Sequence, residues 1–426
     1  MKFLSLLLYN LILWFYHTGL RIAAFFHPKA KKWVNGRKDW EANLTNKLTF
    51  SRQPIWIHCA SLGEFEQGRP LIEAIKKQQP DTKILLTFYS PSGYEIRQNY
   101  PLVDAVIYLP PDSRKNAQKF LKIVNPKMAI FVKYEFWFHY LYTLKKEQIP
   151  TYLISAIFRK SQPFFKWYGG LHRDMLGCFE YIFLQEKGSY ELLENVFTPA
   201  PKGEQDSKKE HLSDNHTSLG IAGNTRFSIT GDTRIDRVMS IQAEKKVLPI
   251  IEQFCKNHQN ILVCGSTWEA DENLLLPIIN NSFSNGYKTI IAPHEINKSH
   301  ISAIQKRLTV PNVTYSLAQI SGIGEAQVLI IDNIGLLAHL YRFGKIAYIG
   351  GGFGSGIHNT LEPIAFGLPV IFGKKFKKFQ EAVTLIENGG AFSINNEVEL
   401  KAVFDKLTQE NFYQNASGKA LKYLRE

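Results

Sequence analysis

The chain has 426 residues, which is too long for one hydrophobic core and predicts two domains. Its 45% hydrophobic and 21% charged residues are ordinary for a globular protein and argue against a disordered chain. A formal net charge of +13 predicts a partner rich in negative charge, such as nucleic acid, an anionic membrane surface or a phosphorylated substrate.

The N-terminus favours the membrane among these partners. The segment "MKFLSLLLYNLILWFYHTGLRIAAFF" is apolar almost throughout, and "HPKAKKWVNGRKDW" follows with a basic, tryptophan-bearing flank. Residues 1–36 are therefore predicted to form a membrane anchor. Its length suits one crossing, about 17–25 residues, but Arg21 equally favours a helix lying in the interface, and both alternatives stay open. No zinc-finger, RRM or KH signature supports nucleic-acid binding.

Strand and helix patterns alternate after the anchor. Short apolar runs such as "PIWIHCA", "KILLTFY" and "KMAIFVK" are each followed or preceded by a longer stretch with helical spacing. The rhythm stops after about residue 196 in a polar stretch that includes an insertion at 203–218, then restarts with "FSITGD" and "NILVCGS". This predicts two Rossmann-like, doubly wound α/β domains facing a cleft, at 37–236 and 237–426.

Four cysteines, Cys59, Cys178, Cys255 and Cys264, show neither paired spacing nor a CxxC motif. Buried thiols in a reducing compartment are expected, without a disulfide framework.

Two carboxylates follow strands in the first half. Glu64, in "CASLGEFEQG", comes after a strand and a glycine, where a helix begins, and Glu135, in "FVKYEFWF", follows another strand. Such carboxylates suit proton abstraction from an attacking hydroxyl. A first-turn glutamate also commonly interacts with the helix dipole, and this structural role stays open for Glu64.

Small and polar residues follow the strands of the second half. In "LVCGSTWEADE" the residues Gly265, Ser266 and Thr267 precede an acid-rich helical turn, where Ser or Thr serves as an N-cap or contacts a ligand. In "IIAPHEI" His294 follows a strand and is placed to donate to a phosphate or carboxylate, although a lone histidine is usually structural.

The stretch "KIAYIGGGFGSGIHNTLEPIAFG" carries the strongest signal. Glycine lets backbone N–H groups approach a phosphate, and Glu362, early in the next helix, suits hydrogen bonds to ribose hydroxyls. The spacing is not GxGxxG, because Ile357 stands where that pattern would close. A nucleotide site is predicted, with a tight structural turn as the alternative. No DxD occurs in the chain, so we expect no required metal and no cofactor.

The motifs "SLGE", "TFYSPSGYE", "KYEFW", "TGDTRID", "GSTWEADE" and "GGGFGSGIHNTLEPIAFGLPVIFG" together resemble those of the 3-deoxy-D-manno-octulosonic acid (Kdo) transferases of lipopolysaccharide core assembly. The resemblance implies a GT-B glycosyltransferase, anchored on the cytoplasmic side of the inner membrane. It would transfer Kdo from CMP-Kdo to the lipid A precursor lipid IVA without a metal.

Residue by residue, the family's catalytic base matches Glu64 and the acid of its second acidic motif matches Glu135. Its nucleotide-binding segment matches the positions from Gly350 to Glu362, among them Gly351, Gly352, His358, Asn359 and Glu362.

The chain departs from the family pattern at four places. Where the family commonly has Glu-Thr-Glu and then Trp-Pro, this chain has Lys133, Tyr134, Glu135, Phe136, Trp137 and Phe138. A Pro-Arg-His of the family is Pro293, His294 and Glu295 here, so the arginine is missing, and His294 or Lys298 is expected to replace it. The family's Ala-Arg-Leu is Ala156, Ile157 and Phe158, with Arg159 displaced, and the 203–218 insertion has no counterpart.

Two other functions stay open from the sequence. A GT-B enzyme that uses a uridine nucleotide sugar would share the glycine-rich turn and Glu362. A non-catalytic, membrane-associated scaffold would share the fold.

Overall fold

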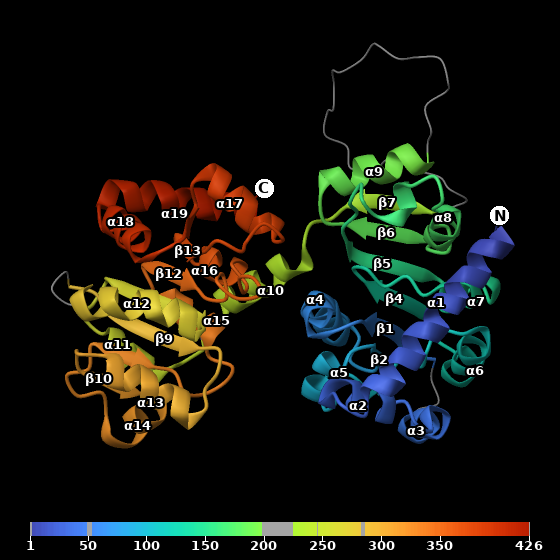
Figure 1. Ribbon diagram of the computed structural model, residues 1–426, viewed down its shortest axis with the longest axis horizontal. Helices are drawn as coiled ribbons and strands as arrows, with labels where there is room; N and C mark the ends of the chain where they lie inside the picture. Colours follow the sequence, from blue (N-terminus) through green and yellow to red (C-terminus); the bar gives the residue numbers. More distant parts are fainter. Residues whose placement is uncertain (1, 49–52, 198–224, 245, 283–285, 426) are drawn as a thin grey trace, which may run out of the picture. The chain divides into compact units, whose positions relative to one another are not determined.

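The computed structural model describes residues 2–48, 53–197, 225–244, 246–282 and 286–425, so the predicted insertion at 203–218 lies outside the described part. The chain divides into two compact units, Met1–Arg234 and Ile235–Glu426 (Figure 1).

The first unit is built on a parallel sheet. Its described residues form seven strands in the spatial order β3-β2-β1-β4-β5-β6-β7. These strands are β1 (Ile55–Cys59), β2 (Ile84–Phe88), β3 (Ala105–Tyr108), β4 (Met128–Val132), β5 (Thr151–Ala156), β6 (Tyr181–Leu184) and β7 (Arg226–Ile229). The strand order reverses between β1 and β4, which is the topological switch point of a doubly wound sheet.

Helices cover both faces of this sheet. They are α1 (Lys2–Ala23), α2 (Pro28–Asn35), α3 (Trp40–Lys47), α4 (Leu62–Gln78), α5 (Pro91–Arg97), α6 (Arg114–Val124), α7 (Phe138–Lys146), η1 (Pro163–Phe165), α8 (Gly170–Leu176) and α9 (Lys187–Phe197). Because successive side chains of a strand point to opposite faces, Trp56 enters the core with α6 and α7, whereas Ile57 and Cys59 enter the core with α4. Strands buried on both sides explain the continuous apolar runs of the sequence.

The second unit repeats this architecture. Its described residues form parallel strands in the order β10-β11-β9-β8-β12-β13-β14, with the reversal between β8 and β12. The strands are β8 (Ile261–Thr267), β9 (Lys288–Pro293), β10 (Asn312–Thr314), β11 (Val328–Ile330), β12 (Ile346–Ile349), β13 (Val370–Gly373) and β14 (Ala391–Ile394).

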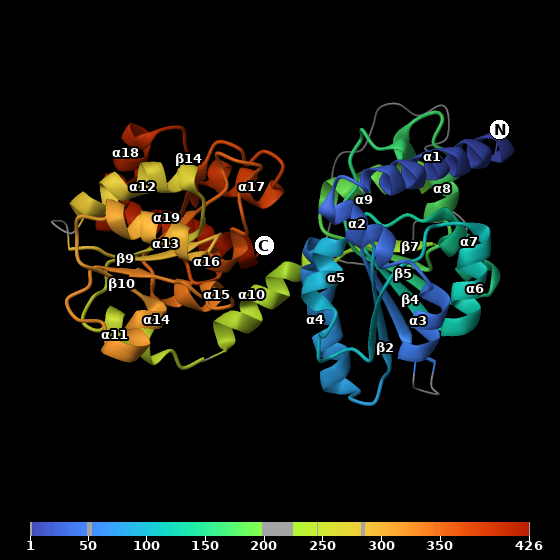
Figure 2. The ribbon, with the colours of Figure 1, turned by 60° about the horizontal axis from the view of Figure 1, so that its bottom comes forward.

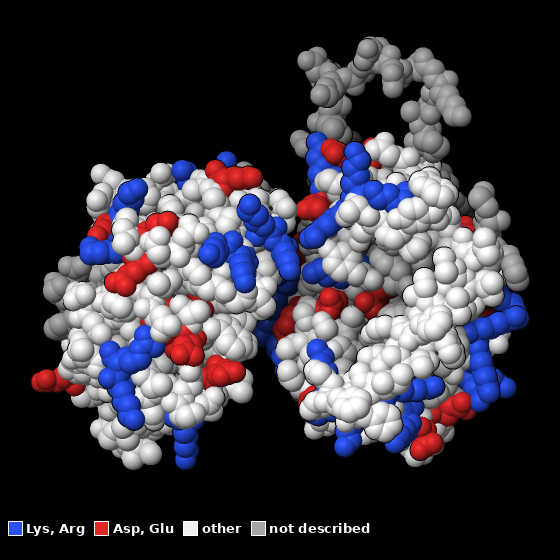
Figure 3. All heavy atoms as spheres, in the orientation of Figure 1, with Lys and Arg blue, Asp and Glu red and all other residues white. Residues whose placement is uncertain are grey.

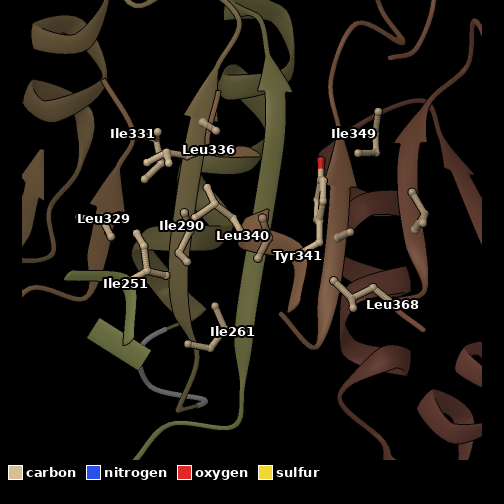
Figure 4. Packing of buried hydrophobic residues seen from close by; sticks show 14 of the residues in the cluster. Ile251, Ile261, Ile290, Leu329, Ile331, Leu336, Leu340, Tyr341, Ile349 and Leu368 are labelled. Atoms are coloured by element: carbon tan, nitrogen blue, oxygen red, sulfur yellow. The ribbon is translucent and has the colours of Figure 1, made fainter. Parts of the chain in front are cut away.

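The helices around the second sheet are α11 (Pro249–Cys255), α12 (Glu269–Ser282), α13 (Lys298–Arg307), α14 (Tyr315–Ser321), α15 (Leu337–Leu340), η3 (Tyr341–Phe343), α16 (Leu361–Ala365), α17 (Gln380–Asn388), α18 (Glu397–Leu407) and α19 (Glu410–Arg425). Helix α10 (Thr233–Ala243) contains the boundary between the two units. On one face of the sheet Tyr341 and Leu340 pack against Ile290 and Ile349 (Figure 4).

The four cysteines are free thiols, and Cys59 and Cys264 are buried in the cores.

Helices α1 and α2 belong to the first unit and lie at the carboxyl edge of its sheet (Figure 2). The Tyr9 hydroxyl donates to Asp112, which follows β3, and accepts from the backbone N–H of Phe138, at the start of α7. No helix in the described part of the chain combines the length and the apolar character that a membrane crossing requires.

Candidate active site

Both carboxylates predicted in the first unit lie beside its switch point. Glu64 follows β1 and Glu135 follows β4, and these strands are neighbours. Both carboxylates lie near the Cys59 thiol. Burial is the main cause that raises the pKa of this thiol, and the negative charges of Glu64 and Glu135 raise it further. In doubly wound sheets this edge is where ligands bind.

Glu64 is held by a reciprocal cap at the start of α4. The backbone N–H of Ser61 donates to Glu64 Oε2 over 3.1 Å, and the Ser61 hydroxyl donates to the same oxygen. This is the capping-box arrangement, which fixes the side chain in one orientation. The sequence left open a helix-dipole role for Glu64, and the structure adds a capping role, which also pre-orients a half-buried carboxylate at the strand edge.

Glu135 lies in a buried polar network. His58 Nε2 is 3.0 Å from Glu135 Oε2, and the indole N–H of Trp137 donates to the same oxygen over 2.7 Å. The other ring nitrogen of His58 lies 2.8 Å from the Thr87 hydroxyl. Glu135 is only 8% exposed, so two partners orient a carboxylate that faces little water.

His58 was missed by sequence reasoning. It lies inside the apolar run of β1 and is fully buried, and burial of a histidine requires hydrogen-bond partners. The sequence did contain a signal for this residue, because a histidine inside the apolar run of a strand buried on both faces must have polar partners.

The backbone is strained where three strands end. Lys133 after β4, Ser155 in β5 and Ser266 in β8 have left-handed backbone conformations, with φ of 69°, 51° and 54°. Such conformations cost about 1–3 kcal/mol each in non-glycine residues and cluster at functional sites.

Arg159 lies near the same edge of the first sheet. Burial raises the pKa of Tyr134, the charge of Arg159 opposes this shift, and Glu186 and Glu64 add to it. The displaced arginine of the sequence pattern is therefore within electrostatic reach of Tyr134.

In the second unit the predicted nucleotide residues lie at the ends of three adjacent strands: Gly265, Ser266 and Thr267 are the last residues of β8 and do not follow it as predicted, His294 follows β9, and Gly351–Glu362 follow β12. The strand order reverses between β8 and β12. Glycine is required here for close approach. A Cβ on Gly350 would lie 2.1 Å from the Ser266 carbonyl oxygen, and one on Gly352 would lie 2.5 Å from the backbone of Gly373. Gly351 has a φ of 91°, which disfavours other residues.

Part of the turn's hydrogen-bonding capacity is used inside the fold. The backbone N–H of Gly351 donates over 2.8 Å to the carboxylate of Asp271, which also accepts from the Tyr348 hydroxyl over 2.8 Å. Asp271, in "TWEADE", is fully buried. The tight structural turn left open by the sequence is thus present, anchored by an aspartate that sequence reasoning did not identify.

Three aromatic rings stack beside this turn. The ring centroid of His294 lies 4.3 Å from that of Trp268 and 4.7 Å from that of His358, and both ring pairs are stacked. The indole N–H of Trp268 donates to His358 Nε2 over 3.1 Å. Burial, and then the charge of His294, lowers the pKa of His358 to about 4.

The other predicted residues are also engaged locally. The Asn359 amide donates to Glu362 Oε1 over 3.0 Å, and its oxygen accepts from the backbone N–H of Leu361. The Thr267 hydroxyl donates to Glu272 over 3.0 Å. Gly265 packs against Tyr341, because a Cβ there would lie 2.1 Å from the Tyr341 hydroxyl. The structure thus brings Gly265–Thr267, His294 and Gly351–Glu362 to one edge.

Comparison with known proteins shows which sequences the chain resembles. The family model described as "3-Deoxy-D-manno-octulosonic-acid transferase (kdotransferase)" matches residues 35–204. A 3-deoxy-D-manno-octulosonic acid transferase of Rickettsia felis is 27% identical over 390 residues, which cover 88% of this chain and 76% of the relative. The resemblance to the Kdo transferase family is confirmed. A 3-deoxy-D-manno-octulosonic acid transferase of Aquifex aeolicus is 26% identical over 355 residues, which cover 81% of this chain and 83% of the relative.

The fold also matches solved structures. The structure of a UDP-GlcNAc 2-epimerase from Neisseria meningitidis matches with a TM-score of 0.56 and 15% sequence identity. The match covers 87% of this chain and 96% of the epimerase chain. The prediction of a GT-B fold with two parallel-sheet α/β domains is confirmed, and the Kdo transferase relatives support a glycosyltransferase.

Proposed function

We propose that this protein transfers Kdo from CMP-Kdo to lipid IVA. The observation that carries the proposal is the similarity to Kdo transferases over most of the chain, which includes both units. The carboxylates at the switch point of the first sheet supply the chemistry that such a transfer needs.

Glu64 acts as the general base in this proposal. A hydroxyl oxygen of lipid IVA attacks the anomeric carbon of Kdo, its proton passes to Glu64, and the bond from that carbon to the CMP phosphate breaks. The capping box supports this role because it holds the carboxylate in a fixed orientation. General base catalysis contributes typically about 10² to 10⁴ in rate. Direct displacement inverts the anomeric centre, and CMP carries away the electron pair of the broken bond.

Glu135 is better suited to position the acceptor. Its oxygen Oε2 already accepts from Trp137 and lies beside His58, and the residue is buried, whereas Glu64 is half-buried and more accessible to an attacking hydroxyl. This makes Glu64 the stronger candidate for the base.

The donor is proposed to bind the second unit, at the Gly351–Glu362 turn. Glu362 accepts hydrogen bonds from the ribose hydroxyls. The stacked rings of His294 and His358 take the place of the family's arginine beside the anionic groups of CMP-Kdo. The resemblance implies that no metal is required.

The protein is proposed to act on the cytoplasmic face of the inner membrane, with α1 lying in the interface. The helix exposes large apolar side chains, including Leu7, Leu8, Leu11, Ile12 and Phe15, while Tyr9 bonds to the domain. Exposed apolar surface above a basic flank suits an anionic bilayer.

The direct test incubates the purified protein with CMP-Kdo and detergent-dispersed lipid IVA and measures the mass of the lipid product. The expected result is a mass increase of one or more Kdo residues. If UMP, and not CMP, protects the protein against thermal unfolding, the uridine nucleotide sugar alternative replaces this proposal.

A further inference from the structure

A groove opens under the N-terminal helix of the first unit. It has a volume of about 390 Å³, within the range of about 300–1,000 Å³ for ligand pockets. One wall comes from α1, through Tyr16, Leu20 and Ala23, and another from α2, through Ala30 and Trp33. These walls are mainly apolar, so the groove suits a hydrocarbon chain.

The third wall connects the groove with the candidate active site. It is formed by Tyr89, Ser90 and Pro91, which follow β2. The backbone N–H groups of Tyr89 and Ser90 both donate to the carbonyl of Ala60, the residue before Ser61. Hydrogen bonds thus connect the groove wall directly to the turn before α4, which holds Glu64.

Tyr89 also connects the groove with Glu135. Its ring stacks on Trp137 with centroids 4.6 Å apart, and the indole N–H of Trp137 donates to Glu135. A ligand in the groove therefore contacts the Tyr89 ring, which packs on Trp137, the residue that donates to Glu135.

The surroundings of the groove suit a lipid with an anionic headgroup. Lys29 lines it, with Lys31 exposed nearby on α2. The apolar face of α1 continues from it, and Figure 3 shows a band of uncharged atoms where α1 crosses this unit.

We propose that this groove binds one acyl chain of the acceptor lipid and so places the acceptor's sugar headgroup beside Glu64. The proposal rests on the proposed function, because it takes the acceptor to be acylated.

The test fills the groove. Ala23→Trp puts a bulky side chain into the α1 wall, and Ala24→Trp is the matched control, since Ala24 is similarly half-buried but does not line the groove. Ala23→Trp is expected to raise the KM for lipid IVA at least about tenfold relative to the control, the loss expected for about two buried methylene groups. With a fully deacylated acceptor the two variants are expected to agree within about twofold. Equal KM values for lipid IVA would overturn the proposal.

A binding experiment separates this proposal from the proposed function. A lipid IVA analogue with a photoreactive diazirine on an acyl chain is expected to label peptides that contain Trp33 or Ser90 in the wild type, and not in Ala23→Trp. Labelling confined to the outer face of α1 would overturn the groove as the binding site and indicate bulk lipid contact. This labelling needs no turnover, so a wild type that makes no Kdo product would refute the proposed function while the groove is still tested.

Discussion

His58 Nε2 and Glu135 Oε2 lie 3.0 Å apart at the carboxyl edge of the first sheet, and both side chains are buried. The two residues are far apart in the sequence and meet because β1 and β4 are adjacent parallel strands. A buried carboxylate whose oxygen already has a histidine and an indole N–H as partners is poorly accessible to an attacking hydroxyl, which suits positioning of a substrate more than transfer of a proton.

A double-mutant cycle tests this pair. His58→Gln and Glu135→Gln are each expected to lower kcat/KM, and the double variant is expected to be less impaired than the product of the two losses. A coupling free energy of about 1–3 kcal/mol is expected for residues in one buried network. Trp137→Phe, combined with His58→Gln, shows whether the coupling includes the second donor. Losses that multiply independently for His58→Gln and Glu135→Gln would contradict the proposed pair.

Tyr9 is expected to join α1 to the body of the first unit. Its hydroxyl donates to Asp112 over 2.7 Å, and Asp112 also accepts from the backbone N–H groups of His139 and Tyr140. Tyr9→Phe should lower the free energy of unfolding by about 1.5–3 kcal/mol, the contribution of a hydrogen bond to a charged group. Denaturant unfolding in detergent measures this, with the exposed Leu8→Ala as control. Equal stability of Tyr9→Phe and the control would contradict the account of α1 as part of the domain.

Glu362 is expected to contribute to donor affinity. Glu362→Gln should raise the KM for CMP-Kdo by an amount corresponding to about 1.5–3 kcal/mol, because a neutral amide accepts ribose hydrogen bonds more weakly than a carboxylate. Asn359→Ala is the matched variant, since it removes the 3.0 Å bond to Glu362 and keeps the carboxylate. If Glu362→Gln leaves the donor KM unchanged and only Asn359→Ala raises it, the Glu362 carboxylate does not contact the donor and has a structural role.

His358 is expected to make stability fall in acid. Its pKa is about 4 in the folded protein, below the ordinary value of about 6.5 that applies to the unfolded chain. The unfolded state therefore binds the proton first, so this contribution to stability is full above about pH 6.5 and decreases as the pH falls towards about 4. Protonation would also remove the acceptor for the Trp268 N–H.

Thermal unfolding of wild type and His358→Gln across pH 4–7 measures this contribution. The variant is expected to lose less stability between about pH 6.5 and 4 than the wild type. Parallel curves would mean that His358 is not responsible for the acid sensitivity.

The parts of the fold that depend on local patterns could be predicted from the sequence. Apolar runs alternating with helical spacing predict both doubly wound sheets. The capping role of Glu64 is consistent with its position three residues after Ser61, which is the capping-box spacing. Likewise the glycines before His358 predict a tight turn.

The partners across strands could not be predicted in this way. His58 reaches Glu135, and Asp271 reaches Gly351, only after the strand order brings distant segments together. The strained backbone at Lys133 and Ser266 has no local sequence signal either, since neither residue is a glycine. Whether residues 1–36 cross a membrane also depends on packing, because Tyr9 bonds to a residue about a hundred positions away.

In the proposed reaction Glu64 takes the proton of the attacking hydroxyl. Since Glu64 also caps α4, Ser61→Ala serves as the matched variant that disturbs the cap and keeps the carboxylate, at a cost of about 0.5–2 kcal/mol in stability. The decisive measurement is kcat with CMP-Kdo and lipid IVA for Glu64→Gln, Ser61→Ala and Glu135→Gln, with CMP affinity measured in parallel. We expect Glu64→Gln to lose at least about 10² in kcat while CMP binds as in the wild type and Ser61→Ala stays within about tenfold of wild-type kcat. Normal turnover by Glu64→Gln, with Glu135→Gln inactive, would contradict this account and assign the base to Glu135.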